Sequence, residues 1–258
     1  MTNLAETCVD SMTVEELLSI AGELDSFIER MMGLRLSYGD IEGSGELLDA
    51  IASLYERQGR ENVVVMNGGS AANFISLYTL VEPGDEVISV YPTYQQLYSI
   101  PESFGAEVKL LRLKPENGFL PDLDELESLV TPRTKLICVN NPNNPTGSLM
   151  APSMLRGIVE IARSVGAWIH SDEVYRFLPH DSNAPIPSLA DMYDRAVSSG
   201  SLSKCFSLAG LRVGWLVGPR GFVGEVSSRR DYTTISCGVL DDMLGRLAVL
   251  NREKIFAR

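Results

Sequence analysis

Residues 201–215 read SLSKCFSLAGLRVGW, and this stretch follows a short β-rich run at Arg195–Ser199. It places Lys204 among Ser, Cys, Phe and Leu residues and not in a run of charges. Partial burial disfavours the charged form of an amine and makes it a usable nucleophile. A lone lysine more commonly lays its stem on apolar surface and keeps its charge in water. Lys204 is therefore a candidate nucleophile, to be judged by what surrounds it in the fold.

Short apolar runs alternate with helical patterns along most of the chain. The apolar runs are Asn62–Met66, Glu86–Val90, Glu107–Leu111, Lys135–Asn140, Ala167–His170 and Arg195–Ser199. Helical spacing at Ser70–Leu80, Leu123–Leu129 and Pro152–Val165 separates most of them. This alternation predicts an α/β fold, with a mostly parallel mixed sheet sandwiched by helices.

Unusual residues gather at the ends of five of the expected strands. The clusters are Asn67–Ser70, Tyr91–Tyr94, Asn140–Gly147, Asp172 and Ser201–Lys204. Ligands of open α/β sheets bind beyond the carboxyl ends of the strands. The clusters therefore predict one shared binding site.

The glycine-rich turn before Ser70 is one part of that site. Gly68 and Gly69 allow a ligand to approach the backbone, and the N-terminus of the helix that follows attracts an anion. A tight turn that binds nothing also needs glycine, so this signal alone leaves both interpretations open.

Two other clusters carry polar side chains at fixed spacing. Pro142 and Pro145 stiffen their loop and would hold the Asn144 amide in one orientation, although a plain turn is the alternative. Asp172 and Tyr175 lie three residues apart, hence on one face if helical. The alternative for Asp172 is a helix N-cap.

Composition and charge exclude several classes of protein. The 258 residues carry a net charge of -12, which disfavours nucleic acid and anionic membrane surfaces as partners. The four cysteines are scattered without a CxxC pair, so we expect free thiols and no metal site. Neither a signal peptide nor a membrane-spanning run is apparent, which predicts a soluble cytoplasmic protein.

Four motifs carry a resemblance to a known family. They are NPNNPTG at 141–147, SDEVY at 171–175, SLSK at 201–204 and GLRVG at 210–214. Their order and separations resemble the class I/II aminotransferases, which are fold-type I pyridoxal-phosphate enzymes, from about Tyr38 to the end of the chain. The resemblance implies pyridoxal 5'-phosphate as the cofactor. It also implies amino-group exchange between an amino acid and a 2-oxo acid.

The resemblance assigns catalytic and ring-binding roles. Lys204 would hold the cofactor as a Schiff base and then shuttle the proton between the substrate Cα and the cofactor. Asp172 would pair with the pyridine nitrogen and keep it protonated. Asn144 and Tyr175 would hydrogen-bond the phenolate oxygen of the ring, and Tyr94 would stack on its face.

The resemblance also implies a phosphate site formed by Gly69, Ser70, Ala71, Ser201 and Arg212. The guanidinium of Arg212 suits this role because it stays charged and bonds phosphate through two N–H groups. Tyr38 matches a family tyrosine that reaches the phosphate of the neighbouring subunit. We therefore expect a homodimer with shared active sites.

Three parts are expected along the chain. Residues 1–45 would form an N-terminal helical segment and dimer arm, 46–240 the cofactor-binding large domain, and 241–258 the start of an interdomain helix. Apolar spacing predicts helices over Glu15–Met32, ended by Gly33, and over Gly45–Gln58. Family members continue into a small C-terminal domain that supplies an arginine for the substrate carboxylate. We expect that domain to be absent here, and no residue is assigned to its role.

Two alternatives to transamination are kept open. The same cofactor residues also serve elimination, oxidation or cyclisation of an amino acid, because fold does not fix the reaction. A cofactor-binding fragment with little turnover is the other alternative. The motifs do not separate these functions, nor do they identify the amino acid or the oxo acid.

Overall fold

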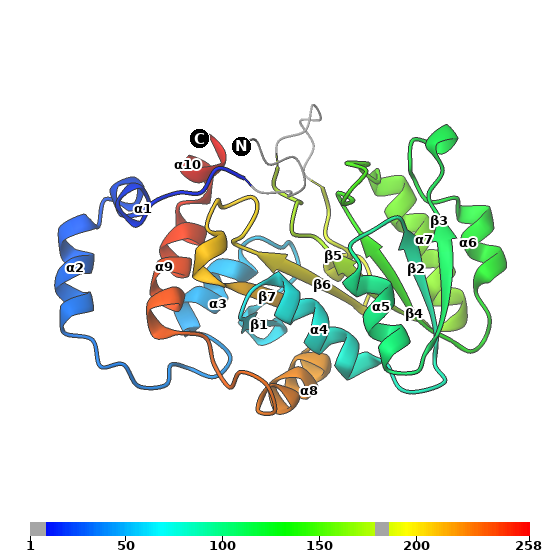
Figure 1. Ribbon diagram of the computed structural model, residues 1–258, viewed down its shortest axis with the longest axis horizontal. Coiled ribbons are helices and arrows are strands. Elements are labelled where there is room, and N and C mark those ends of the chain that lie inside the picture. Colours follow the sequence, from blue (N-terminus) through cyan, green and yellow to red (C-terminus); the bar gives the residue numbers. More distant parts are fainter. Residues whose placement is uncertain (1–8, 179–185) are drawn as a thin grey trace.

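The computed structural model describes residues 9–178 and 186–258. Its centre is a seven-stranded sheet between helices (Figure 1). The strands are β1 Val63–Met66, β2 Glu86–Tyr91, β3 Glu107–Arg112, β4 Thr134–Asn140, β5 Trp168–Asp172, β6 Ala196–Ser201 and β7 Gly214–Val217. They lie in the order β1-β7-β6-β5-β4-β2-β3.

The sheet is mixed but mostly parallel. Neighbouring strands from β3 through β2, β4 and β5 to β6 pair in parallel, and β7 pairs antiparallel with both β6 and β1. The predicted fold class is therefore confirmed. The strand β7 was not among the predicted strands.

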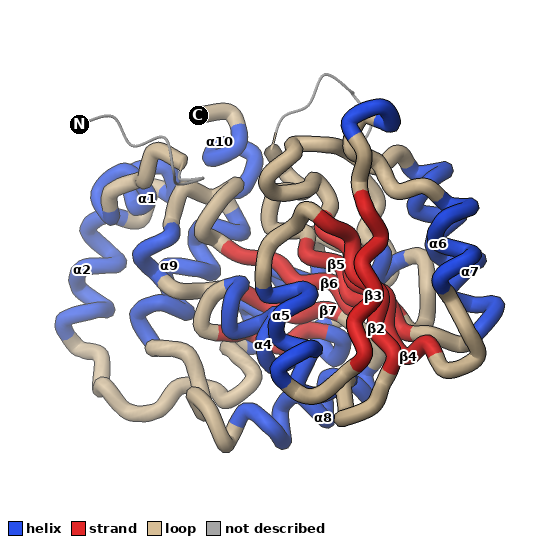
Figure 2. The backbone as a smooth tube through the Cα atoms, turned by 45° about the vertical axis from the view of Figure 1, so that its right-hand side comes forward, coloured by secondary structure: helices blue, strands red, loops and turns tan. Residues whose placement is uncertain are grey.

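Helices cover both faces of the sheet (Figure 2). They are α1 Val14–Ala21, α2 Leu24–Met32, α3 Gly45–Ala52, α4 Gly69–Leu80, α5 Gln96–Ser103, α6 Leu123–Leu129, α7 Pro152–Val165, α8 Arg220–Arg230, α9 Val239–Leu250 and α10 Arg252–Phe256. Short 3₁₀ turns lie at η1 Arg60–Asn62, η2 Pro115–Asn117, η3 Leu189–Asp191 and η4 Ala209–Leu211. Among the described residues, no helix is both long and apolar enough to cross a membrane.

The core is divided by the sheet because successive side chains of a strand point to opposite faces. In β1, Val64 and Met66 pack with residues of α4 and α8, whereas Val63 and Val65 pack with α3 and α9. Farther along the sheet, Leu155 and Ile158 of α7 cover the face of β4 opposite α4. This two-sided burial holds the carboxyl ends of the strands in place.

Two of the predicted helices are shorter or divided in the structure. The helix expected over Glu15–Met32 is broken at Gly22, which caps α1 in the left-handed region at φ 70°. The helix expected over Gly45–Gln58 ends at Ala52. At the other end of the chain, Asn251 separates α9 from α10, since its side chain bonds back to the Leu247 carbonyl.

Candidate active site

A cavity of about 230 Å³ opens at the carboxyl ends of β4, β5 and β6, beside the N-terminus of α4. Its walls are formed by Gly69, Ser70, Asn73, Tyr94, Asn140, Asn144, Asp172, Val174, Tyr175, Ser201, Ser203, Lys204, Ala209 and Arg212. The strand-end clusters of the sequence thus meet around one space, as parallel strands require.

One corner of the cavity is built to hold an anion. The helix α4 begins at Gly69 without a side-chain cap, so the N–H groups of its first turn point outward. A Cβ on Gly68 would lie 2.5 Å from Nη2 of Arg212, and one on Gly214 would lie 2.5 Å from the Gly68 carbonyl carbon. Gly68 also has a φ of 90°, which other residues rarely adopt, and Gly214 meets backbone atoms, so both positions require glycine.

The guanidinium of Arg212 adds positive charge to this corner. Its Nη1 donates to the Ala209 carbonyl at 3.0 Å and lies 3.4 Å from Oγ of Ser203. It forms no ion pair with a carboxylate within residues 9–178 and 186–258. An exposed cation beside a helix N-terminus, with the Ser201 and Ser203 hydroxyls close by, is the donor set that phosphate prefers.

The carboxylate of Asp172 forms the floor of the cavity and is 2% exposed. Its Oδ2 accepts from Nδ2 of Asn73 at 2.8 Å, and its Oδ1 accepts from the Val174 N–H at 3.2 Å. Burial raises the pKa of Asp172, while these hydrogen bonds and the charge of Lys204 act in the opposite direction. The neighbouring charge of Glu173 adds to the increase.

The loop that carries Asn144 is fastened to the same strand end. Nδ2 of Asn140 donates to the Asp172 carbonyl at 2.8 Å, and its Oδ1 accepts from the Asn144 N–H at 2.6 Å. Nδ2 of Asn143 donates to the Pro92 carbonyl at 3.1 Å. The predicted stiffness of this loop thus comes from side-chain hydrogen bonds as well as from its prolines.

Lys204 is half-buried at the edge of the cavity, where its Nζ lies 5.8 Å from the ring centre of Tyr175. The adjacent thiol is a poorer nucleophile. Burial raises the pKa of Cys205 to about 11, and its Sγ lies 3.1 Å from the Val174 carbonyl, to which it donates. The amine of Lys204 lines the cavity, whereas the thiol of Cys205 does not.

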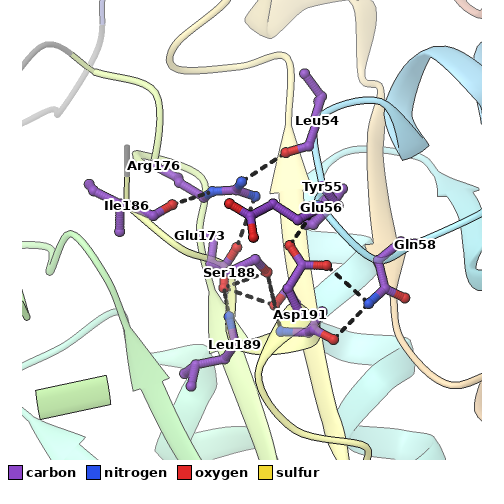
Figure 3. Close-up of polar contacts among 12 residues, drawn as sticks. Leu54, Tyr55, Glu56, Gln58, Glu173, Arg176, Ile186, Ser188, Leu189 and Asp191 are labelled. Carbon is purple, nitrogen blue, oxygen red and sulfur yellow. Dashed lines mark hydrogen bonds and ion pairs between the residues drawn. The ribbon is translucent and has the colours of Figure 1, made fainter. Parts of the chain in front are cut away.

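A buried polar network fixes the chain directly after Asp172 (Figure 3). Oε1 of Glu173 accepts from Ser188, from Ser198 and from the Leu189 N–H at 2.8–3.1 Å. Arg176 lies 3.6 Å from Glu173 and donates to the carbonyl of Leu54 at 2.8 Å. These contacts hold the segment between β5 and Tyr175 in place. Neither Glu173 nor Arg176 lines the cavity.

The structure brings nearly all of the predicted site residues together. Tyr94 lies 3.3 Å from Ser70, hydroxyl to hydroxyl, and both line the cavity. Ala71 belongs to the first turn of α4 but does not line the cavity. Tyr38 is 79% exposed and also stands outside it.

Sequence reasoning gave no role to five residues that line the cavity: Asn73, Asn140, Val174, Ser203 and Ala209. Asn140 and Ser203 lie within the quoted clusters but were given no role. Asn73 is a buried amide in the helical pattern at 70–80, and its polarity there was the signal that could have found it.

The fold and the cavity define a cofactor domain of the aminotransferase type, and the chain belongs to the class I and II aminotransferase family, whose model matches residues 2–247. Capreomycidine synthase from Streptomyces vinaceus is 36% identical over 91% of this chain and 61% of its own length. A solved PLP-dependent aminotransferase from Streptococcus suis has a TM-score of 0.95 and 44% identity, covering 99% of this chain and 68% of the other. The solved PLP-dependent cyclase OrfR has a TM-score of 0.89 and 27% identity, covering 98% and 65%.

The family implies pyridoxal phosphate as the cofactor, and the residues of the cavity fit that group. The corner of Gly69 and Arg212 offers N–H donors and positive charge for a phosphate. The buried carboxylate of Asp172 suits a protonated ring nitrogen. The chain spans 61% of the length of capreomycidine synthase and 50% of that of a probable N-succinyldiaminopimelate aminotransferase from Mycobacterium tuberculosis.

Proposed function

We propose that the chain is a pyridoxal-phosphate-dependent aminotransferase that moves an amino group between an amino acid and a 2-oxo acid. One observation carries the proposal. A lysine amine, a buried carboxylate and an anion-binding corner line a single cavity of a chain in this family. The bound cofactor supplies an aldehyde for the amino group and a ring that withdraws electrons from the substrate Cα.

The residues of the chain then divide the remaining tasks. The first turn of α4, Ser201 and Arg212 bind the phosphate. Asp172 holds a proton at the ring nitrogen, and the amine of Lys204 moves the proton at the substrate Cα. Asn144 and Tyr175 donate hydrogen bonds at the ring oxygen.

Amino-group exchange is tested by isotope transfer. We expect ¹⁵N from a labelled amino acid to appear in the amino acid formed from a second, added 2-oxo acid, with no release of ammonia. Mass spectrometry of the products, with a panel of amino donors, measures this transfer. Ammonia release without an acceptor, or no transfer with any donor, would contradict the proposal.

Cyclisation is the second candidate, because a solved cyclase and capreomycidine synthase are among the relatives. The same cofactor residues serve both reactions, so the products decide between them. A cyclic amino acid that retains its ¹⁵N, formed without any oxo acid, is the outcome that favours this candidate.

We also propose a homodimer in which Tyr38 reaches the neighbouring phosphate site. Large apolar side chains that favour such an interface lie exposed on one chain: Tyr38 is 79% exposed, Tyr232 81%, Tyr78 42% and Phe74 39%. A chain that sediments at the mass of a monomer would count against it.

The phosphate contact of Tyr38 gives this dimer a second test. Tyr38→Phe is expected to raise the dissociation constant of pyridoxal phosphate by about tenfold, the effect of one hydrogen bond to a charged group. The affinity for pyridoxal, which lacks the phosphate, is expected to stay unchanged. Equal losses for both ligands would place Tyr38 elsewhere.

A further inference from the structure

A line of buried polar side chains begins at Asp172 and Asn73, in the wall of the cavity, and continues into the protein. It links β5, α4 and β6, and its members are Asn73, His170, Ser76 and Ser199, each at most 1% exposed. Buried polar groups are costly unless their hydrogen bonds are made. None of these residues belongs to the cofactor contacts proposed above.

The hydrogen bonds of Asn73 determine which way its amide points. Its Oδ1 accepts from Oγ of Ser199 at 2.7 Å and lies 3.0 Å from Nε2 of His170. Its Nδ2 donates to Oδ2 of Asp172 at 2.8 Å. A flipped amide would turn its oxygen toward a carboxylate oxygen, so the two contacts at Oδ1 lock the donor toward Asp172.

His170, the next residue of the line, has its donor and acceptor nitrogens fixed in the same way. Because a carbonyl oxygen only accepts, Nε2 of His170 must carry the hydrogen, and Nδ1 then accepts from Oγ of Ser76 at 2.9 Å. Burial lowers the pKa of His170 to about 4, so the ring is neutral at pH 7. The line therefore adds hydrogen bonds, and no charge, behind Asp172.

The donor from Asn73 matters because Asp172 is buried. Its carboxylate accepts one hydrogen bond from this side chain and one from the Val174 backbone. The charged groups that face Asp172 are Lys204, which favours the ionised carboxylate, and Glu173, which opposes it. If the donor is lost, a buried charged oxygen is left without a hydrogen bond. This costs more free energy than the hydrogen bond itself contributes to stability.

We propose that Asn73, held by His170 and Ser199, is a positioning residue that keeps the Asp172 carboxylate ionised and aimed into the cavity. The inference rests on the proposed function for the role of Asp172 at the ring nitrogen. The arrangement of the line itself involves residues of this chain alone.

The first test follows the titration of Asp172 in the 258-residue chain without cofactor, by ¹³C NMR of the labelled carboxyl groups. The Asp172→Asn variant identifies the signal. In Asn73→Leu we expect Asp172 to titrate at higher pH than in the parent. Ser89→Ala, which removes another buried strand serine outside the line, is the matched control and should leave the titration unchanged.

If Asn73→Leu does not fold, variants at His170 still test the inference. His170→Gln retains an N–H donor for the Asn73 oxygen, so Asp172 should titrate in this variant as it does in the parent. His170→Phe keeps the bulk but loses the donor, and should shift the titration in the direction of Asn73→Leu. Identical titration of Asp172 in the parent, His170→Phe and Ser199→Ala would overturn the inference.

Binding of pyridoxal phosphate separates this inference from the proposed function. We expect the dissociation constant to rise at least about tenfold in Asn73→Leu, as for the loss of one charged hydrogen bond. A shifted Asp172 titration with unchanged cofactor affinity would support the role of Asn73 and refute that of Asp172 at the ring. An unshifted titration would refute the role of Asn73, whatever the affinity.

Discussion

Replacing Lys204 with alanine is expected to reduce turnover by about 10²- to 10⁴-fold, the range found when a general acid–base group is lost. The amine lies at the edge of the cavity, 5.8 Å from the ring centre of Tyr175, and the adjacent thiol of Cys205 is kept protonated by burial. That thiol stays protonated at neutral pH and therefore does not replace the amine as a base. Steady-state kinetics with the amino donor found by ¹⁵N transfer measure the loss.

Absorbance gives the same prediction an independent readout. The cofactor attached to Lys204 should show a band in the near-ultraviolet or visible range, and this band should be absent from Lys204→Ala. Lys135→Ala is the matched control, because Lys135 is half-buried on β4 but outside the cavity. If Lys204→Ala kept both the band and the parent turnover, another group would be the nucleophile.

Asp172→Asn is expected to reduce turnover by about 10²- to 10³-fold while the cofactor stays bound, because removing one preorganised electrostatic contact costs that much in rate. The change keeps the size of the side chain and leaves an amide oxygen to accept from Asn73, so the floor of the cavity should persist. What it removes is the negative charge that holds a proton on the ring nitrogen.

The kinetic constants and the cofactor affinity distinguish a loss of charge from a loss of structure. We expect the decrease in kcat, measured at saturating cofactor, to exceed any change in cofactor affinity. Asp172→Glu, which restores the charge on a longer side chain, should recover part of the rate. Parent-like kcat in Asp172→Asn would show that the ring does not need this carboxylate.

The sequence predicted the fold where periodicity and length agree. The helices at 123–129 and 152–165 occur as predicted, and each predicted strand is present within two residues at either end. The strand β7 was missed because its four residues, GWLV, show no period and begin with glycine, which is depleted in strands, unlike the VVVM of β1. The break at Gly22 was missed because apolar spacing continues across it, with Leu18 and Phe27 both buried.

The sequence predicted those residues of the candidate site that come directly after a strand or belong to a recognised motif. Lys204, Asp172, Asn144 and Arg212 come from four segments, and the parallel sheet brings these to one cavity. Asn73 could not be paired with His170 from the sequence, because the two lie 97 positions apart and meet only through the packing of α4 on β5. Division of the chain at residues 45 and 240 stays a prediction.

The lysine to which the cofactor is attached identifies the active site. Lys204 is one of five lysines in the chain. The measurement loads the protein with pyridoxal phosphate, reduces it with borohydride, digests it and maps the labelled peptide by mass spectrometry. We predict that the adduct lies on Lys204 alone. An adduct on Lys109, Lys114, Lys135 or Lys254 instead, or none on any lysine, would contradict the assignment of Lys204 as the cofactor-binding lysine.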